Sequence, residues 1–194
     1  TIARADKRDA WLNVGVNTRA QTQPPDLELA FAPVKKARTD FIVEKATELG
    51  ARSIQPVMTR FTQSERVRVD RLQALVKEAA EQTERLDLPH VSEAVKLEAF
   101  LDAFPAERRL LYCDEAGDDP DAPWGGERGR ARPIRAALSD AQASDGWTIL
   151  IGPEGGFSAE ERRRLRAEAF CLPVTLGPRI LRADTAAAAA MSVW

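Results

Sequence analysis

The chain carries two kinds of apolar pattern in alternation. Short apolar runs such as LELAFA, from Leu27, and WTILIG, from Trp147, are typical of buried β-strands. Between such runs, apolar residues return at every third or fourth position, which is typical of helices. The clearest helical pattern lies within residues 67–85 and consists of Val69, Leu72, Val76, Ala79 and Ala80. Strands that alternate with helices predict an α/β domain with a mostly parallel sheet.

The same patterns place the other elements. Further strands are predicted at residues 1–5, 10–16 and 53–58, near Val91, and within the runs RRLLYCDEA and FCLPVTLG. Further helices are predicted at residues 37–50 and 97–104 and within IRAALSDA and TAAAAAMSVW. In the helix at 37–50 the predicted buried face consists of Phe41, Ile42, Ala46 and Leu49, with Gly50 as the stop.

Two helix starts carry capping signals. Ser158 and Glu161 have the spacing of a capping box, which predicts a helix directly after GPEGGF. Asp184 or Thr185 is expected to cap the last helix, whose alanine run has high helical propensity. The basic residues of the helix after Ser158 are expected to form a solvated face, and they are Arg162, Arg163, Arg164 and Arg166.

A polar, proline-containing segment, NTRAQTQPPDLE, separates the first two strands from the rest. Two isolated strands cannot bury a core, and the chain does not begin with Met. Residues 1–23 are therefore expected to be the remnant of a β-rich domain with its linker. Residues 24–194 are expected to form the main domain.

Composition narrows the function classes only a little. Apolar residues make up 44% and charged residues 30% of the chain, as in ordinary globular proteins. The net charge of −2 provides no overall attraction to nucleic acid, so RNA binding would depend on local basic clusters. No apolar run reaches the ~18 residues that a membrane helix needs, so no membrane partner is expected.

The cysteines point to a reducing compartment. Cys113 and Cys171 both stand in apolar runs, which predicts buried free thiols and a cytoplasmic location. With His90 as the only histidine, two scattered cysteines argue against a structural zinc site, and no metal is expected. A carboxylate-bound magnesium stays open on this argument.

Three predicted strands end in unusual loops. Ligands of parallel α/β sheets bind beyond the carboxyl ends of strands. The loops at residues 113–116, 152–157 and 177–185 follow such ends. If the three strands are neighbours, these loops are expected to line one crevice.

The loop IGPEGGF suits a ligand held by main chain. It matches neither a dinucleotide fingerprint nor a phosphate-binding P-loop, but paired glycines permit close approach to the backbone. Glu154 could accept a hydrogen bond from a ribose hydroxyl or pair with an arginine. The alternative interpretation, favoured on residue types alone, is a tight strand-to-helix turn with a solvated Glu154.

The loop LGPRILRADT places Ile180 and Leu181 between Arg179 and Arg182. Apolar side chains flanked by arginines suit a flat heterocycle beside an anionic substrate. The alternative is a surface loop whose arginines pair with neighbouring acids. In the third loop, Asp114 and Glu115 could bind a hydroxyl or a cation, although acids at strand ends are more often solvated.

Several long segments together resemble one known family. APVKKARTDFIVEKATELGARSIQPV, EAAEQTERLDLP, IGPEGGFSAEE and LGPRILRADTAA are similar to segments of the bacterial 16S ribosomal RNA uridine-N3 methyltransferases, which belong to the SPOUT class. The resemblance runs from about Leu27 to the C-terminus. GPEGG combined with LG-x-RILR-x-[ED]TA is a specific signature. Asp184 stands where many members carry Glu, and residues 117–132 match no motif of the family.

The resemblance implies a fold and a reaction. The fold would be a SPOUT-type trefoil knot with a mostly parallel sheet, and residues 1–23 would be the remnant of an N-terminal PUA-like β-barrel. The cofactor would be S-adenosyl-L-methionine, and the substrate N3 of one uridine in 16S rRNA of the small ribosomal subunit. The enzyme would be a homodimer whose site is completed by the partner chain.

The resemblance also implies the site residues. The cofactor-binding residues would be Cys113, Asp114, Glu115, Ile151, Gly152, Pro153, Glu154, Gly155, Gly156, Leu176, Gly177, Ile180, Leu181, Arg182, Thr185 and Ala186. Arg182, and after it Arg179, would stabilise the negative charge that spreads over uracil when N3 loses its proton. No general base is assigned. The RNA phosphates would meet Lys35, Lys36 and Arg38.

Three alternatives stay open. The chain could be another SPOUT-class RNA methyltransferase, or an RNA-binding module that kept the fold without catalysis. It could also be a nucleotide-binding enzyme that holds phosphate at the Ser158 helix start, although the Glu154 carboxylate would repel phosphate.

Overall fold

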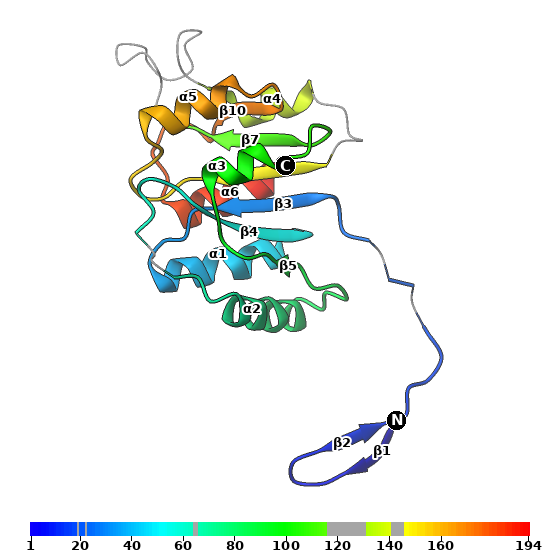
Figure 1. The fold of residues 1–194 in the computed structure, drawn as a ribbon. Coiled ribbons are helices and arrows are strands. Elements are labelled where there is room, and N and C mark those ends of the chain that lie inside the picture. The colour runs from blue at the N-terminus through cyan, green and yellow to red at the C-terminus, as the bar shows by residue number, and fades with distance from the viewer. Residues whose placement is uncertain (19, 22, 64–65, 116–130, 141–145) are drawn as a thin grey trace.

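The structure is a computed structural model that describes residues 1–18, 20–21, 23–63, 66–115, 131–140 and 146–194. Its N-terminal hairpin pairs β1 (Ile2–Ala5) with β2 (Ala10–Leu12) in antiparallel fashion. Both strands are exposed along their whole length, and Figure 1 shows the hairpin at a distance from the α/β domain, joined to it by an extended segment. Two strands are confirmed here, although the second ends at Leu12 rather than at residue 16.

A mostly parallel sheet forms the centre of the domain, as predicted. Its described strands follow the order β5-β4-β3-β9-β7-β10-β8, and every pair of neighbours is parallel. The long strands are β3 (Leu27–Phe31), β4 (Ser53–Met58), β7 (Arg109–Cys113), β9 (Trp147–Ile151) and β10 (Cys171–Thr175). The short strands are β5 (His90–Val91), β6 (Val95–Lys96), which pairs with β4, and β8 (Arg132–Pro133). The pattern predicted β5, near Val91, but missed β6 and β8, which are equally short.

Helices cover both faces of the sheet (Figure 1). They are α1 (Lys36–Glu48), α2 (Val69–Gln82), α3 (Leu97–Asp102), α4 (Ile134–Ser139), α5 (Ala159–Ala167) and α6 (Ala183–Val193). The core divides into two clusters: one contains buried residues of α1, α2, α4 and α6, and the other those of α3 and α5. Alternate residues of the central strands enter alternate clusters, as with Ile149 and Leu150 of β9. Burial on both faces explains why these strands read as continuous apolar runs.

The predicted buried face of α1 was partly wrong. Phe41 is 40% and Leu49 39% exposed, whereas the residues that the helix buries are Thr39, Ile42, Val43, Ala46 and Thr47. The buried stripe is centred between Ile42 and Val43, so Leu49 falls at its edge and Phe41 falls near the opposite side of the helix. The two threonines tolerate burial because each hydroxyl donates to a backbone carbonyl, of Val34 and Val43 respectively, at 2.9 Å. Gly50 ends the helix with φ +91°, as predicted.

Of the two predicted caps, one is confirmed. The Glu161 amide donates to the Ser158 hydroxyl at 3.2 Å, and the Ser158 amide donates to a Glu161 carboxylate oxygen at 2.8 Å. The cap predicted for α6 was wrong, because Arg182 occupies the N-cap position and Asp184 lies inside the first turn. There the carboxylate still faces the positive end of the helix dipole.

Candidate cofactor site

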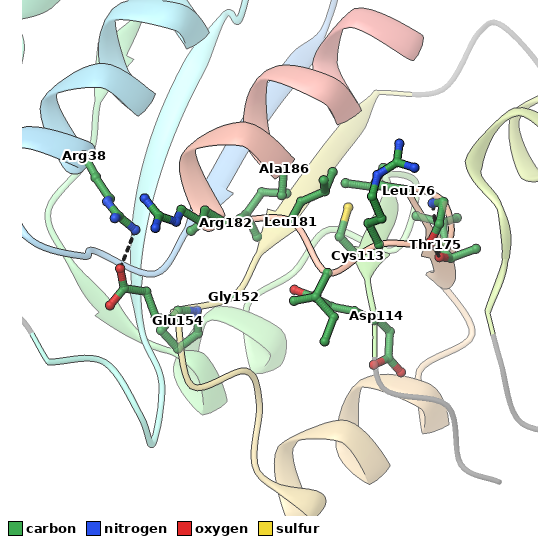
Figure 2. A pocket seen from close by; sticks show the side chains of 18 residues that line it. Arg38, Cys113, Asp114, Gly152, Glu154, Thr175, Leu176, Leu181, Arg182 and Ala186 are labelled. Atoms are coloured by element: carbon green, nitrogen blue, oxygen red, sulfur yellow. Dashed lines mark hydrogen bonds and ion pairs between the residues drawn. The ribbon is translucent and has the colours of Figure 1, made fainter. Parts of the chain in front are cut away.

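The neighbouring strands β9, β7 and β10 bring three loops to one edge of the sheet. Leu111 of β7 lies beside Ile149 of β9 and Leu172 of β10, so the carboxyl ends of the three strands are adjacent. A pocket of about 310 Å³ opens there (Figure 2). The predicted convergence of the loops is confirmed for the residues that the structure describes; Ala116 lies outside them.

Most of the predicted residues line this pocket. They are Cys113, Asp114, Glu115, Ile151, Gly152, Pro153, Glu154, Leu176, Gly177, Arg179, Ile180, Leu181, Arg182 and Ala186. Gly155, Gly156 and Thr185 lie outside the lining formed by the described residues. Sequence reasoning did not place Arg38, Val174, Thr175 and Ala183 here. Val174 and Thr175 are the last residues of β10 before the predicted Leu176, and Ala183 lies inside the predicted loop at residues 177–185, so a wider set of residues around each loop would have included all three.

Close packing explains the first glycine of the pocket. A Cβ on Gly152 would lie 2.5 Å from the Phe157 ring. That ring packs edge-on against the buried Tyr112, with centroids 5.1 Å apart. The loop therefore folds back onto its own phenylalanine, and only a residue without a side chain fits at position 152.

A second glycine shapes the opposite wall. Gly177 has φ +126°, a conformation that L side chains rarely adopt. The Thr175 hydroxyl braces this turn, since it donates to the Gly177 carbonyl at 3.2 Å and accepts from the Gly177 amide at 3.4 Å. At Gly177 the wall between β10 and Ile180 therefore consists of main chain alone.

Asp114 differs from its predicted setting. Its side chain is 3% exposed, and its carboxylate accepts hydrogen bonds from Arg162 at 3.1 and 3.2 Å and from Arg166 at 2.7 and 3.1 Å. In Figure 2 the carboxylate is turned away from the pocket, toward α5. Asp114 therefore lines the pocket at the end of β7 while its side chain anchors α5.

The solvated arginine face predicted for α5 was wrong at two positions. Arg162 and Arg166 are four residues apart, so they lie on one side of the helix and both reach Asp114. Arg164 pairs instead with Asp102 and Glu168 at the surface, where its side chain is 49% exposed. The spacing of the two arginines is visible in the sequence, but the sequence does not show that Asp114 is their partner.

A second ion pair closes one side of the pocket. Nη1 of Arg38 lies 2.6 Å from Oε1 of Glu154, and Nε of Arg38 lies 3.9 Å from Asp184. The contacts join α1, the Gly152 loop and the start of α6. Figure 2 shows Arg182 directed toward the same side of the pocket as Arg38 and Glu154. Arg38 comes after the carboxyl end of β3, and β3 is the neighbour of β9 in the sheet. The sequence does not show this strand order, so it could not place Arg38 at the pocket.

The electrostatic setting is mixed. Burial, and then the charge of Asp114, raises the pKa of Glu115 above its usual value. Burial, with the charges of Glu115 and Asp114, raises the pKa of Cys113 to about 12, so this thiol is a neutral wall of the pocket. Arg179 and Arg182 are exposed at the mouth of the pocket.

Among the described residues no cluster of metal-ligating side chains occurs, and none of their helices is long and apolar enough to cross a membrane.

A pocket beyond neighbouring carboxyl ends of parallel strands is typical of α/β enzymes that bind nucleoside-like cofactors. The family comparison specifies the class. Residues 21–194 match the RNA methyltransferase domain family, and the chain belongs to that family.

Curated relatives carry one name. A ribosomal RNA small subunit methyltransferase E from Rickettsia conorii is 32% identical over 184 residues, 93% of this chain and 70% of that protein. A protein of the same name from Synechocystis is 32% identical over 172 residues, 87% of this chain and 52% of that protein. The chain therefore spans between 52% and 70% of the length of these two relatives.

A solved structure has the same fold. The crystal structure of a ribosomal RNA small subunit methyltransferase E from Neisseria gonorrhoeae, bound to S-adenosyl methionine, aligns with a TM-score of 0.75 and 30% identity. The alignment covers 91% of this chain and 68% of that one.

Proposed function

We propose that this chain transfers the methyl group of S-adenosyl-L-methionine to N3 of one uridine in 16S rRNA of the small ribosomal subunit. The observation that carries the proposal is the pocket at the ends of β7, β9 and β10, in a member of the RNA methyltransferase domain family. The names of its relatives, and the cofactor bound in one of them, supply the reaction class.

The residues present fit the proposed cofactor. The pocket volume of about 310 Å³ lies at the lower end of the range for small-ligand sites, about 300–1,000 Å³. Apolar side chains for the adenine come from Ile151, Leu176, Leu181 and Ala186. The bare turns at Gly152 and Gly177 let main chain approach the nucleoside. Gly155, Gly156 and Thr185 would support these loops from outside the lining.

The Glu115 carboxylate suits a sulfonium nucleoside better than a nucleotide, because a carboxylate attracts a cationic sulfur but repels phosphate. Glu154 also lines the pocket, but its charge is paired with that of Arg38. Arg179 and Arg182 lie in the same lining and are assigned here to the RNA side, so the calorimetry described below decides between the sulfonium nucleoside and a phosphate ligand. When bound, S-adenosylmethionine supplies an electrophilic methyl group.

The chain contributes alignment and charge stabilisation. Methyl transfer needs an in-line nucleophile, so holding uracil and cofactor in place provides much of the rate. As N3 loses its proton, negative charge spreads to the flanking carbonyl oxygens, and Arg182 is the proposed group that stabilises it, with Arg179 second. Both arginines line the mouth of the pocket.

The RNA would approach over the start of α1. Lys35 and Lys36 are exposed there and are proposed to contact phosphates. Arg38 has a second role beside that prediction, because it is paired with Glu154. Through this pair, Arg38 would hold the loop at residues 152–157, called the cofactor loop below. Its positive charge would also lie on the side of the pocket where the RNA approaches.

The larger assembly is also part of the proposal. Residues 24–194 would form a SPOUT domain with a trefoil knot, and residues 1–23 would belong to a PUA-like barrel and its linker. The active form would be a cytoplasmic homodimer whose partner completes the site. Exposed apolar side chains on the adjoining helices α1 and α6, Phe41 and Val193, support such an interface.

Calorimetry with S-adenosylmethionine and, in parallel, with ATP tests the cofactor first. Binding of ATP alone would overturn the proposal. The second step measures methyl incorporation from labelled cofactor into unmethylated 30S subunits. Cofactor binding without incorporation at any enzyme concentration would favour the non-catalytic RNA-binding alternative.

Arg182→Ala tests the assigned residue. Loss of one charge-stabilising donor is expected to lower turnover by about 100-fold, with cofactor affinity nearly unchanged. Arg163→Ala, at an exposed position of α5, is the matched control and should leave turnover unaltered. Unaltered turnover in Arg182→Ala would remove this residue from the mechanism.

A further inference from the structure

An exposed aromatic side chain lies beside the cofactor loop. Phe61, in the segment between β4 and α2, is 46% exposed. A Cβ built on Gly155 would lie 3.1 Å from Cβ and 3.5 Å from Cγ of Phe61. Gly155 follows Glu154, which lines the pocket. Phe61 therefore rests against the outside of the loop that forms one pocket wall, while nearly half of its surface faces solvent.

Hydrogen bonds hold this segment in place. The Arg60 amide donates to Oε1 of Glu161 at 2.7 Å, and the other oxygen of Glu161 caps α5 by accepting from the Ser158 amide. The Thr59 amide donates to the Thr62 hydroxyl at 2.8 Å, and the two threonine hydroxyls lie 2.9 Å apart. One carboxylate thus ties the Phe61 turn to the helix that follows the cofactor loop.

A fixed, exposed aromatic is suited to stacking. Because the turn is already ordered, a planar ligand that stacks on the phenyl ring pays little additional ordering entropy. An aromatic face accepts any nucleobase, since every base has a π-face. Arg60, which is also exposed, adds a cation next to the ring for the adjoining phosphates.

We propose that Phe61 is the stacking platform for an unpaired base next to the methylated uridine, an inference that rests on the proposed function. N3 lies on the pairing edge of uracil, so the target must leave its helix before methyl transfer. Its neighbour in the strand then loses a stacking partner. Phe61 replaces that partner one loop away from the pocket, so it positions the RNA without touching the reacting atoms.

Three variants of the full chain test this role. Phe61→Leu keeps an apolar contact with Gly155 but removes the π-face, whereas Phe61→Trp keeps the face. Leu88→Ala, at another exposed apolar position beyond the far end of α2, is the control. The measurements are filter-binding affinity for unmethylated 30S subunits, KM and kcat for their methylation, and calorimetric affinity for S-adenosylmethionine.

Phe61→Leu is expected to weaken 30S binding and raise KM by about 10-fold, the effect of losing one base–aromatic stack. Cofactor affinity and kcat should stay within about twofold of wild type, and Phe61→Trp and Leu88→Ala should bind 30S subunits like wild type. Wild-type binding by Phe61→Leu would overturn the proposal. So would a parallel loss of cofactor affinity, which would show that Phe61 only braces Gly155. A changed sedimentation coefficient with unchanged 30S binding would overturn it in favour of a protein contact.

The proposed function fails in a different way. If wild type binds 30S subunits but transfers no methyl group, the reaction is refuted. A Phe61-dependent affinity in the same experiment would still support the stacking site.

Discussion

Replacing Asp114 by Asn tests the anchoring of α5. The substitution keeps the shape of the side chain but removes the charge that two arginines share. Removal of one partner from a buried ion pair costs about 3–5 kcal/mol. The Arg162 and Arg166 side chains are 17% and 24% exposed, so water compensates part of their loss. A decrease of about 2–3 kcal/mol in the free energy of unfolding is therefore expected.

Urea unfolding followed by circular dichroism measures this change. The urea midpoint should fall without a change in slope, because the surface exposed on unfolding is the same. For a chain of this size the melting temperature should fall by roughly 5–10 °C. Affinity for S-adenosylmethionine should also fall, because α5 begins directly after the cofactor loop.

Asp102→Asn is the matched control. Asp102 pairs with Arg164 of the same helix, but the two side chains are 65% and 49% exposed. A solvated pair contributes less than about 1 kcal/mol, so this variant should unfold nearly like wild type. If both variants lose the same stability, or if Asp114→Asn loses less than about 0.5 kcal/mol, the buried anchor is not the reason for this arrangement.

Two further predictions concern the pocket wall and the thiols. Gly152→Ala should lower stability by about 1–3 kcal/mol and weaken cofactor binding, because the new Cβ would overlap the Phe157 ring; Gly15→Ala, where a Cβ meets no atom within 4 Å, should change neither quantity in the same urea and calorimetry experiments. Cys113 and Cys171 each have a pKa raised to about 12 by burial, so their thiolates are scarce at pH 8. Iodoacetamide should therefore alkylate the folded chain far more slowly than the chain in guanidinium, and the rate should keep rising with pH well above 9. A rate that levels off near pH 9 would contradict the burial argument.

Local pattern was sufficient for much of the fold. The runs LELAFA and WTILIG predicted central strands because a strand buried on both faces has no polar side, and both are central in the sheet. The spacing of Ser158 and Glu161 predicted a helix start because a capping box involves only neighbouring residues. Loop positions followed from strand ends, so the three walls of the pocket could also be predicted.

Tertiary structure decided the partners of the charged groups. Asp114 meets arginines 48 and 52 residues further along the chain, and Arg38 meets Glu154 across 116 residues. Periodicity reports which side of an element is buried but not which distant element packs on it, so these pairs could not be read from the sequence. The same limit applies to α1, where the packing of α2 and α6 left Phe41 and Leu49 outside the buried stripe. The long strands, the helices and the loops depend on near neighbours in the chain, so local sequence was enough to predict them. The pairing of the short strands β6 and β8, the meeting of the loops and the burial of their charges depend on the order of the strands in the sheet, which no local pattern contains.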